Sequence, residues 1–96
     1  MAILTTFKHT GNPEEIFKLA EDKVRPAARQ AGAEEGQISS TIVRTEDGVM
    51  LINLWETEEG MRRAAERIGP VARASGLPPQ QEWRMYEVLH HAHRHG

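Results

Sequence analysis

Three side chains in this sequence are of types that could act together on a small organic molecule: His9, Asn53 and Trp55. Imidazole changes charge near neutral pH and can serve as a general base. A buried amide must find hydrogen-bond partners, which a substrate carbonyl or hydroxyl can supply, and an indole offers a flat apolar wall with one N–H donor. Asn53 and Trp55 share one face of an extended apolar run. These three residues are the predicted catalytic group.

Each of the three also has a purely structural interpretation. Trp55 could be a core residue at the end of a strand, because large aromatic side chains dominate small cores. Asn53 could bond to a neighbouring side chain or across a dimer, since buried polar groups are usually satisfied within the protein. His9 could face solvent at the end of a strand. The sequence leaves both sets of interpretations open.

Substrate contacts are predicted for Phe7, Arg84 and Tyr86. Trp83 and Tyr86 lie on opposite faces of a predicted strand, so at most one of them lines a given face, and we choose Tyr86 for a polar contact. Arg84 shares the face of Tyr86 and could pair with an anionic substrate. Its alternative is a solvated surface arginine, which is the common state of such residues.

Composition excludes several classes of function. Twelve basic and 14 acidic residues give a net charge of −2, which does not favour binding to nucleic acid or to an anionic membrane. There is no cysteine, so disulfides, thiolate metal sites and cysteine nucleophiles are excluded. No apolar stretch is long enough to span a membrane and the first residues do not form a signal peptide, so we expect a cytoplasmic protein.

The C-terminal segment 90–96 holds four of the five histidines: His90, His91, His93 and His95. Alternate histidines of an extended tail would project to one side and could bind nickel, copper or zinc adventitiously. A physiological site also needs fixed geometry and supporting hydrogen bonds, which a terminal segment does not offer. We predict a flexible tail, no metal site and no cofactor.

The first half of the chain predicts a strand and a bent helix. Residues 2–9 suit a strand. Asn12 can cap a helix that begins at Pro13, with Glu15 three residues after the cap. The apolar stripe of this helix thins to alanine. Pro26 should bend or divide the helix near residues 22–25, and Gly32 should end it.

The second half predicts a hairpin, a helix and a last strand. Residues 37–44 form the second strand and residues 45–48 are a tight-turn sequence that leads into the apolar run 48–55. Thr57 caps the second helix. The pair Gly69-Pro70 should break that helix, residues 76–79 form a stiff connector, and residues 81–89 make the final strand.

This order of elements predicts a single ferredoxin-like α+β domain over residues 1–96, with four antiparallel strands and two helices on one face of the sheet. Both faces of the run 48–55 are apolar, which is unusual for an antiparallel strand with one wet face. A second copy of the chain is the simplest cover for the bare side. We therefore expect a homodimer that forms a closed barrel.

The hairpin and the segment Ile52-Asn53-Leu54-Trp55-Glu56-Thr57-Glu58-Glu59 resemble the signature of the antibiotic biosynthesis monooxygenase-like (ABM) family of dimeric α+β barrels. Pro26 and Gly36 also fall where that family often carries proline and glycine. The resemblance covers nearly the whole chain by element order, although its specific part is short. It implies a pocket between sheet and helices, in which Trp55 matches the family tryptophan.

Cofactor-independent members of that family oxidise aromatic, polyketide-like molecules with molecular oxygen. The resemblance therefore implies an enzyme that stabilises a substrate carbanion or phenolate in a dry cavity. The alternative is a non-catalytic dimeric barrel that binds a hydrophobic small molecule. Haem-degrading relatives combine the tryptophan with an asparagine on the first strand and a histidine in the following helix. This sequence lacks both, which argues against haem.

Overall fold

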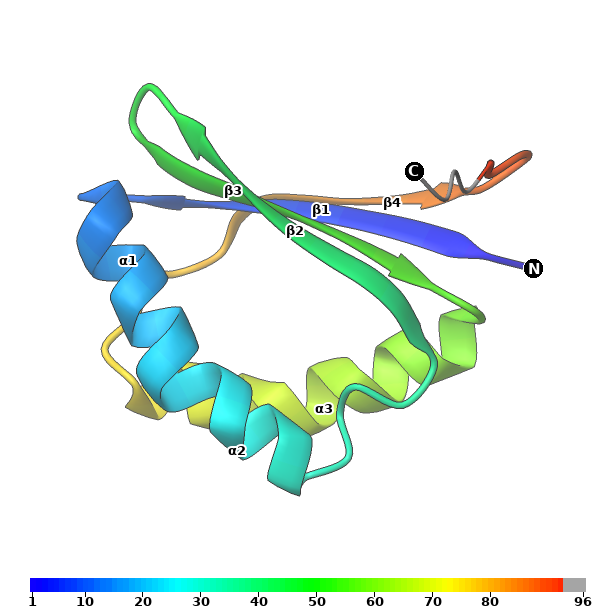
Figure 1. Cartoon of the computed structure of the whole chain (residues 1–96), viewed down its shortest axis with the longest axis horizontal. Helices are drawn as coiled ribbons and strands as arrows, with labels where there is room; N and C mark the ends of the chain where they lie inside the picture. The colour runs from blue at the N-terminus through cyan, green and yellow to red at the C-terminus, as the bar shows by residue number, and fades with distance from the viewer. Residues whose placement is uncertain (93–96) are drawn as a thin grey trace.

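A computed structural model describes residues 1–92 of the 96-residue chain. The strands are β1 (Ile3–Thr10), β2 (Gln37–Thr45), β3 (Gly48–Trp55) and β4 (Gln81–Glu87). The helices are α1 (Pro13–Leu19), the π-helical segment η1 (Ala20–Val24), α2 (Arg25–Gln30) and α3 (Glu58–Ala74). Figure 1 shows the sheet on one side and all the helices on the other. The predicted ferredoxin-like order is confirmed.

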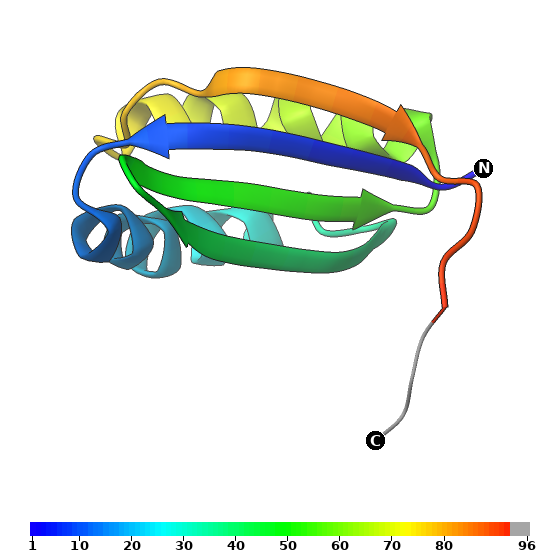
Figure 2. The same ribbon diagram turned by 90° about the horizontal axis from the view of Figure 1, so that it is seen from above.

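The four described strands form one antiparallel sheet in the order β2-β3-β1-β4. Figure 2 shows this order from above, with the helices beneath. The register of the two central strands places Thr5 beside Asn53, Phe7 beside Leu51 and His9 beside Val49. Because side chains alternate along a strand, all of these residues face the helices. The central strands therefore set out a row of side chains beneath the sheet.

The first helical region begins as predicted and is divided where Pro26 required it. The Asn12 side chain accepts a hydrogen bond from the Glu15 N–H at 3.1 Å, and Pro13 starts α1. Proline has no N–H and its ring collides with the carbonyl four residues earlier in a regular helix. The chain relieves this with η1, in which the Arg25 N–H donates to the Ala20 carbonyl, five residues back.

The helix α3 corrects one expectation. Thr57 caps it by accepting a hydrogen bond from the Gly60 N–H at 3.1 Å, as predicted. The expected break at Gly69-Pro70 was wrong, because α3 continues through Pro70 to Ala74. A proline usually ends a helix partly because its ring meets the Cβ of the preceding residue. Gly69 has no Cβ, so this collision is absent and the helix gains an extra turn.

The core lies between the helix-facing side of the sheet and the helices. Its buried cluster comprises Ile3, Ala28, Ala33, Trp55, Met61 and Ala64. Ala28, Ala33 and Ala64 have small side chains, so α2 and α3 can pack closely although the apolar stripe of the first helical region is narrow. The opposite face of the sheet is also apolar, with Met50 and Ile52 half-buried and Tyr86 49 % exposed. No helix of the described chain covers that face (Figure 1).

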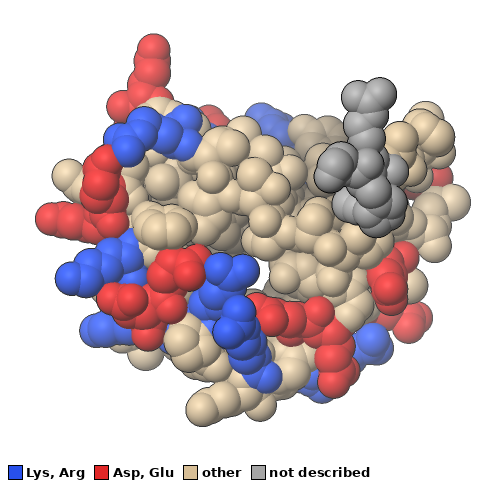
Figure 3. Space-filling view, in the orientation of Figure 1, with Lys and Arg blue, Asp and Glu red and all other residues tan. Residues whose placement is uncertain are grey.

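Charged side chains are concentrated away from the middle of the sheet. In Figure 3 they cover the helices and the end of the β2–β3 hairpin, while uncharged atoms dominate the upper part of the same face. Lys8 pairs with Asp47 at 3.3 Å near that hairpin. No helix among residues 1–92 is long and apolar enough to cross a lipid bilayer.

Candidate functional site

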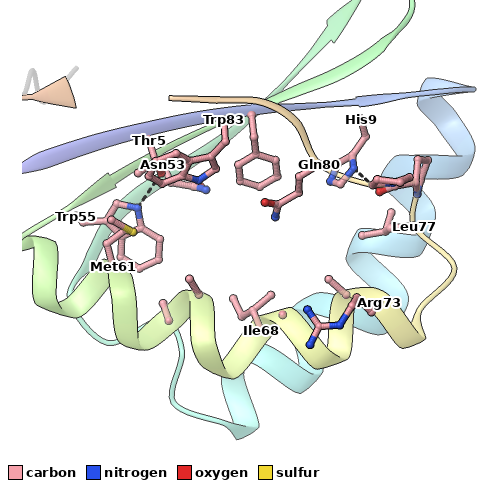
Figure 4. Close-up of a pocket in the computed structure, with 17 residues that line it drawn as sticks. Thr5, His9, Asn53, Trp55, Met61, Ile68, Arg73, Leu77, Gln80 and Trp83 are labelled. Atoms are coloured by element: carbon pink, nitrogen blue, oxygen red, sulfur yellow. Dashed lines mark hydrogen bonds between the residues drawn. The ribbon is translucent and has the colours of Figure 1, made fainter. Parts of the chain in front are cut away.

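A cavity of about 680 Å³ lies between the sheet and α3. β1 contributes Thr5, Phe7 and His9 to its upper wall, and β3 contributes Asn53 and Trp55. Small and apolar side chains of α3 form the opposite wall, and the loop before β4 closes one end (Figure 4). The cavity volume falls in the range of small-molecule sites, which are mostly apolar with a few polar groups.

Asn53 carries the unusual polar feature of this cavity. Its side chain lines the cavity and is only 7 % exposed, and its Oδ1 has no hydrogen-bond partner among the described residues. Buried side-chain oxygens are nearly always bonded, because leaving one unpaired costs about 1–3 kcal/mol. An unpaired amide oxygen at the wall of a cavity is a ready acceptor for a ligand O–H or N–H. Rotation of the amide would present donors instead.

Trp55 lies beside Asn53 but does not offer its N–H to the cavity. The indole Nε1 donates to Thr5 Oγ1 at 3.1 Å, and both side chains are buried (Figure 4). The structure assigns this N–H to Thr5, so it is not free for a ligand. Trp55 therefore contributes a flat apolar wall. The Thr5 hydroxyl, which accepts from the indole, keeps its own proton for another acceptor.

His9 is 4 % exposed, so it does not face solvent. Its Nδ1 lies 2.8 Å from the carbonyl oxygen of Pro78. A carbonyl can only accept, so Nδ1 carries the proton and Nε2 of the neutral ring is left with the lone pair. The Phe7 ring meets the imidazole edge to face, with the ring centres 5.5 Å apart. These contacts hold a potential general base at the wall of the cavity.

Gly48 is the first residue of β3, and it allows β3 to approach the backbone of β1 closely at His9. A Cβ at this position would collide with the His9 carbonyl oxygen. The Gly11 N–H also donates to the Asp47 carbonyl at 2.8 Å, which ties the end of β1 to the hairpin turn. The glycine that ends the turn sequence thus fixes the position of the histidine as well as the direction of the hairpin.

The structure brings together four of the six predicted site residues: Phe7, His9, Asn53 and Trp55. The other two lie elsewhere. Tyr86 pairs with Leu4 and Arg84 with Thr6, which places both on the outer face of the sheet. Neither lines this cavity. Of the two aromatic residues on β4 it is Trp83, not Tyr86, that lines it.

Sequence reasoning missed Thr5 and Arg73. Thr5 has the same strand parity as Phe7 and His9, so the alternation of β1 could have identified it. Arg73 lies on the final turn of α3, beyond the expected break, and is exposed at the rim of the cavity. No carboxylate among residues 1–92 lies within ion-pair distance of it. It is a cation beside a largely apolar cavity.

The ionisable groups with shifted pKa values lie outside the cavity. A hydrogen bond from Arg44 lowers the pKa of the Glu14 carboxyl, and hydrogen bonds from Thr45 and then Lys8 lower the pKa of Asp47. Both carboxylates are on the surface near the β2–β3 hairpin and α1. Within residues 1–92, no group of three histidine or acidic side chains could hold a metal ion. Residues 93–96 of the predicted histidine-rich tail lie outside the described residues.

No protein family and no curated protein matches the sequence. Solved structures do match the fold. SnoaB, a cofactor-independent oxygenase from Streptomyces nogalater, has a TM-score of 0.63 and 21% identity, over 94% of this chain and 93% of its own. A monooxygenase from the gene ActVA-Orf6 of Streptomyces coelicolor, solved with nanaomycin D, has a TM-score of 0.65 and 20% identity, over 98% and 92%. Rv0793 from Mycobacterium tuberculosis gives 0.67 and 12%, over 97% and 100%.

The chain has the ABM fold. The predicted resemblance is therefore confirmed at the level of the fold, across almost the whole chain. In this ABM-fold chain the cavity has a hydrogen-bonded Trp55–Thr5 pair, an unpaired Asn53 oxygen and a histidine held by a backbone carbonyl. The arrangement can bind a flat apolar molecule, orient one polar group and accept a proton.

Proposed function

We propose that the chain is a cofactor-independent monooxygenase that oxidises an aromatic or otherwise hydrophobic small molecule in the cavity between the sheet and α3. The unpaired, buried Oδ1 of Asn53 is the observation that carries this proposal. A group that costs stability and gains nothing within the protein is best explained by a partner that arrives with the ligand. The shared fold with two oxygenases supports the class of reaction.

In the proposed reaction an activated methylene of the substrate loses a proton to Nε2 of His9, which leaves a carbanion conjugated with the aromatic ring. Asn53 orients a carbonyl or hydroxyl of that ring, and Phe7 and Trp55 hold its faces. The substrate then reduces dioxygen. One oxygen atom becomes a ring carbonyl and the other leaves as water with the two methylene hydrogens, so the substrate supplies all the electrons.

Oxygen uptake with anthrone and naphthol substrates tests this proposal. We expect uptake that depends on protein concentration and is reduced at least tenfold in Asn53→Ala, in line with the loss of an oriented hydrogen bond in a buried site. Gln30→Ala is the matched control, because Gln30 is exposed on α2 and does not line the cavity. Folded protein that consumes no oxygen across a broad panel would contradict the proposal.

We also propose that the chain works as a homodimer. Met50, Ile52 and Tyr86 form part of an apolar outer face that no helix of the described chain covers. A twofold dimer would bury this face against its own copy, since an isologous interface uses the same patch twice. The proposed contact leaves the cavity free, because the cavity lies on the other side of the sheet.

A non-catalytic barrel that binds a hydrophobic ligand is the second candidate. It is favoured by the hydrogen bond between Trp55 and Thr5, because that bond gives the tryptophan a structural role. Kinetics of Trp55→Phe separate the two candidates. Loss of turnover with intact folding and assembly favours the enzyme, whereas unchanged ligand binding with no turnover in either protein favours the binder.

A further inference from the structure

A second space of about 90 Å³ adjoins the large cavity, and both are lined by Phe7, His9, Ile68, Ala72, Leu77 and Gln80. A third space of about 380 Å³ follows on the far side. It shares Phe17, Ala20, Val24, Ile42 and Leu51 with the second. Through these shared walls the three spaces lie in a row beneath the sheet, from the β4 side to the β2 side, and this row is called the channel below.

The far end of this channel opens at the surface. Its rim includes Glu21, Arg25, Glu34 and Gln37. Figure 3 views the molecule from this side and shows a hollow near the centre of the face, between basic and acidic side chains. Arg25 donates to Glu21 at 2.8 Å, and Glu34 pairs with Arg29 at 3.7 Å, so each charge at the rim has an opposite partner. The channel thus has one mouth near Arg73 and a second mouth between η1 and β2.

The middle of the channel is narrow and apolar. Its volume of about 90 Å³ is the smallest of the three spaces and lies well below the roughly 300–1,000 Å³ of sites that hold a drug-sized ligand. Apart from His9 and Gln80, its lining is carbon-rich. Ala20 and Val24, which line this space, belong to the π-helical segment η1. Such segments often mark functional positions in helices.

We propose that the channel binds a molecule with a flat ring system and an unbranched alkyl or acyl chain. The ring system occupies the large cavity, and the chain passes between Phe7 and Ile68 towards the β2 mouth. This inference rests on the proposed function for the place of the ring and adds the substrate class: a ring that carries a slender apolar tail. A methylene chain matches a passage that is narrow, apolar and open at its far end.

Calorimetric titration of 1-naphthol and its n-alkyl derivatives, from ethyl to octyl, tests the proposal. Each added methylene that enters the channel should tighten the Kd by roughly fourfold, until the chain emerges at the second mouth. In Ile42→Trp the new ring should block the neck, so the dependence on chain length should disappear while the Kd for 1-naphthol stays unchanged. Ile38→Trp is the control, because Ile38 is on the same strand and 48 % exposed outside the channel.

Val24→Phe provides a second block from the helix side, in case the change on β2 prevents folding. Affinity that does not change with chain length, or that changes equally in the blocked and control variants, overturns the proposal. A complete lack of binding by the series does the same. Chain-length dependence that the block abolishes, in a protein that consumes no oxygen, supports the channel and counts only against the proposed oxygenation.

Discussion

Thr5 and Trp55 form a buried pair across the two central strands, with the indole Nε1 3.1 Å from the threonine Oγ1. Their strands are adjacent, and Thr5 lies directly beside Asn53 in the register. The pair gives the tryptophan a fixed orientation while it leaves the amide of Asn53 without a partner for its oxygen. The cavity wall therefore contains one satisfied polar group and one unsatisfied polar group as neighbours.

Thr5→Val should destabilise the protein by about 1–3 kcal/mol, because the buried indole N–H loses its acceptor while the volume stays nearly the same. Urea denaturation measures the loss. The double variant with Trp55→Phe, which removes the donor as well, should recover part of it. Purely additive effects of the two changes would show that the hydrogen bond contributes no coupling energy.

Asn53→Leu should separate stability from function. Removal of an unsatisfied buried oxygen should leave the free energy of unfolding unchanged or raise it by about 1 kcal/mol, since an apolar side chain of similar size has no desolvation cost. Oxygen uptake or ligand binding should fall at least tenfold. A clear loss of stability on denaturation would instead mean that the amide is bonded within the folded protein.

Arg73→Ala should discriminate between ligands by charge. The guanidinium is exposed at the rim, so its removal should change stability by less than about 0.5 kcal/mol. Aromatic carboxylates should bind several-fold more weakly while their neutral analogues bind as before, and the difference should shrink at high salt. Arg63→Ala, at an exposed position of the same helix outside the cavity, is the control. Equal weakening of both ligand types would contradict a charge contact.

Strand periodicity predicted much of this site, because alternation puts Phe7 and His9 on one face of β1, and Asn53 and Trp55 on one face of β3. That both faces lie on the same side of the sheet follows from the pairing register, which is a tertiary property. Strand periodicity could not decide whether Trp83 or Tyr86 lines the cavity. β4 pairs with β1 through a register shift between Thr6 and Lys8, and alternation alone cannot tell which face the helices cover.

The other differences between the sequence predictions and the structure concern the two helical prolines and the burial of Asn53. The Pro26 interruption was predictable, because a missing N–H and a ring collision have local consequences, but the π-helical form that it takes depends on packing against the sheet. At Pro70 the helix continues although the N–H is missing, and Gly69 removes only the contact between the proline ring and a preceding Cβ. Because a break was expected there, Arg73 was not among the predicted site residues. The unpaired oxygen of Asn53 depends on every neighbour in space, which no local pattern records.

Acid should weaken the fold partly through Asp47. Its pKa is lowered in the folded protein by the hydrogen bond from Thr45 and then by Lys8, so its contribution is fully present above the unfolded pKa of about 4 and is lost as the pH falls through the folded value. Wild-type stability should therefore decline more steeply below about pH 4 than that of Asp47→Asn. Parallel curves from urea denaturation at each pH would contradict this.

The outer face of the sheet gives a final prediction. Ile52 lies on the central strand β3, on the side opposite the cavity, in an apolar surface that no helix of residues 1–92 covers. Ile52→Lys should convert a dimer into a monomer at micromolar concentration, because a charge would be buried in the proposed interface. Sedimentation velocity measures the change, with Glu66→Lys on the exposed side of α3 as the control. A wild-type protein that sediments as a stable, folded monomer would refute the interface.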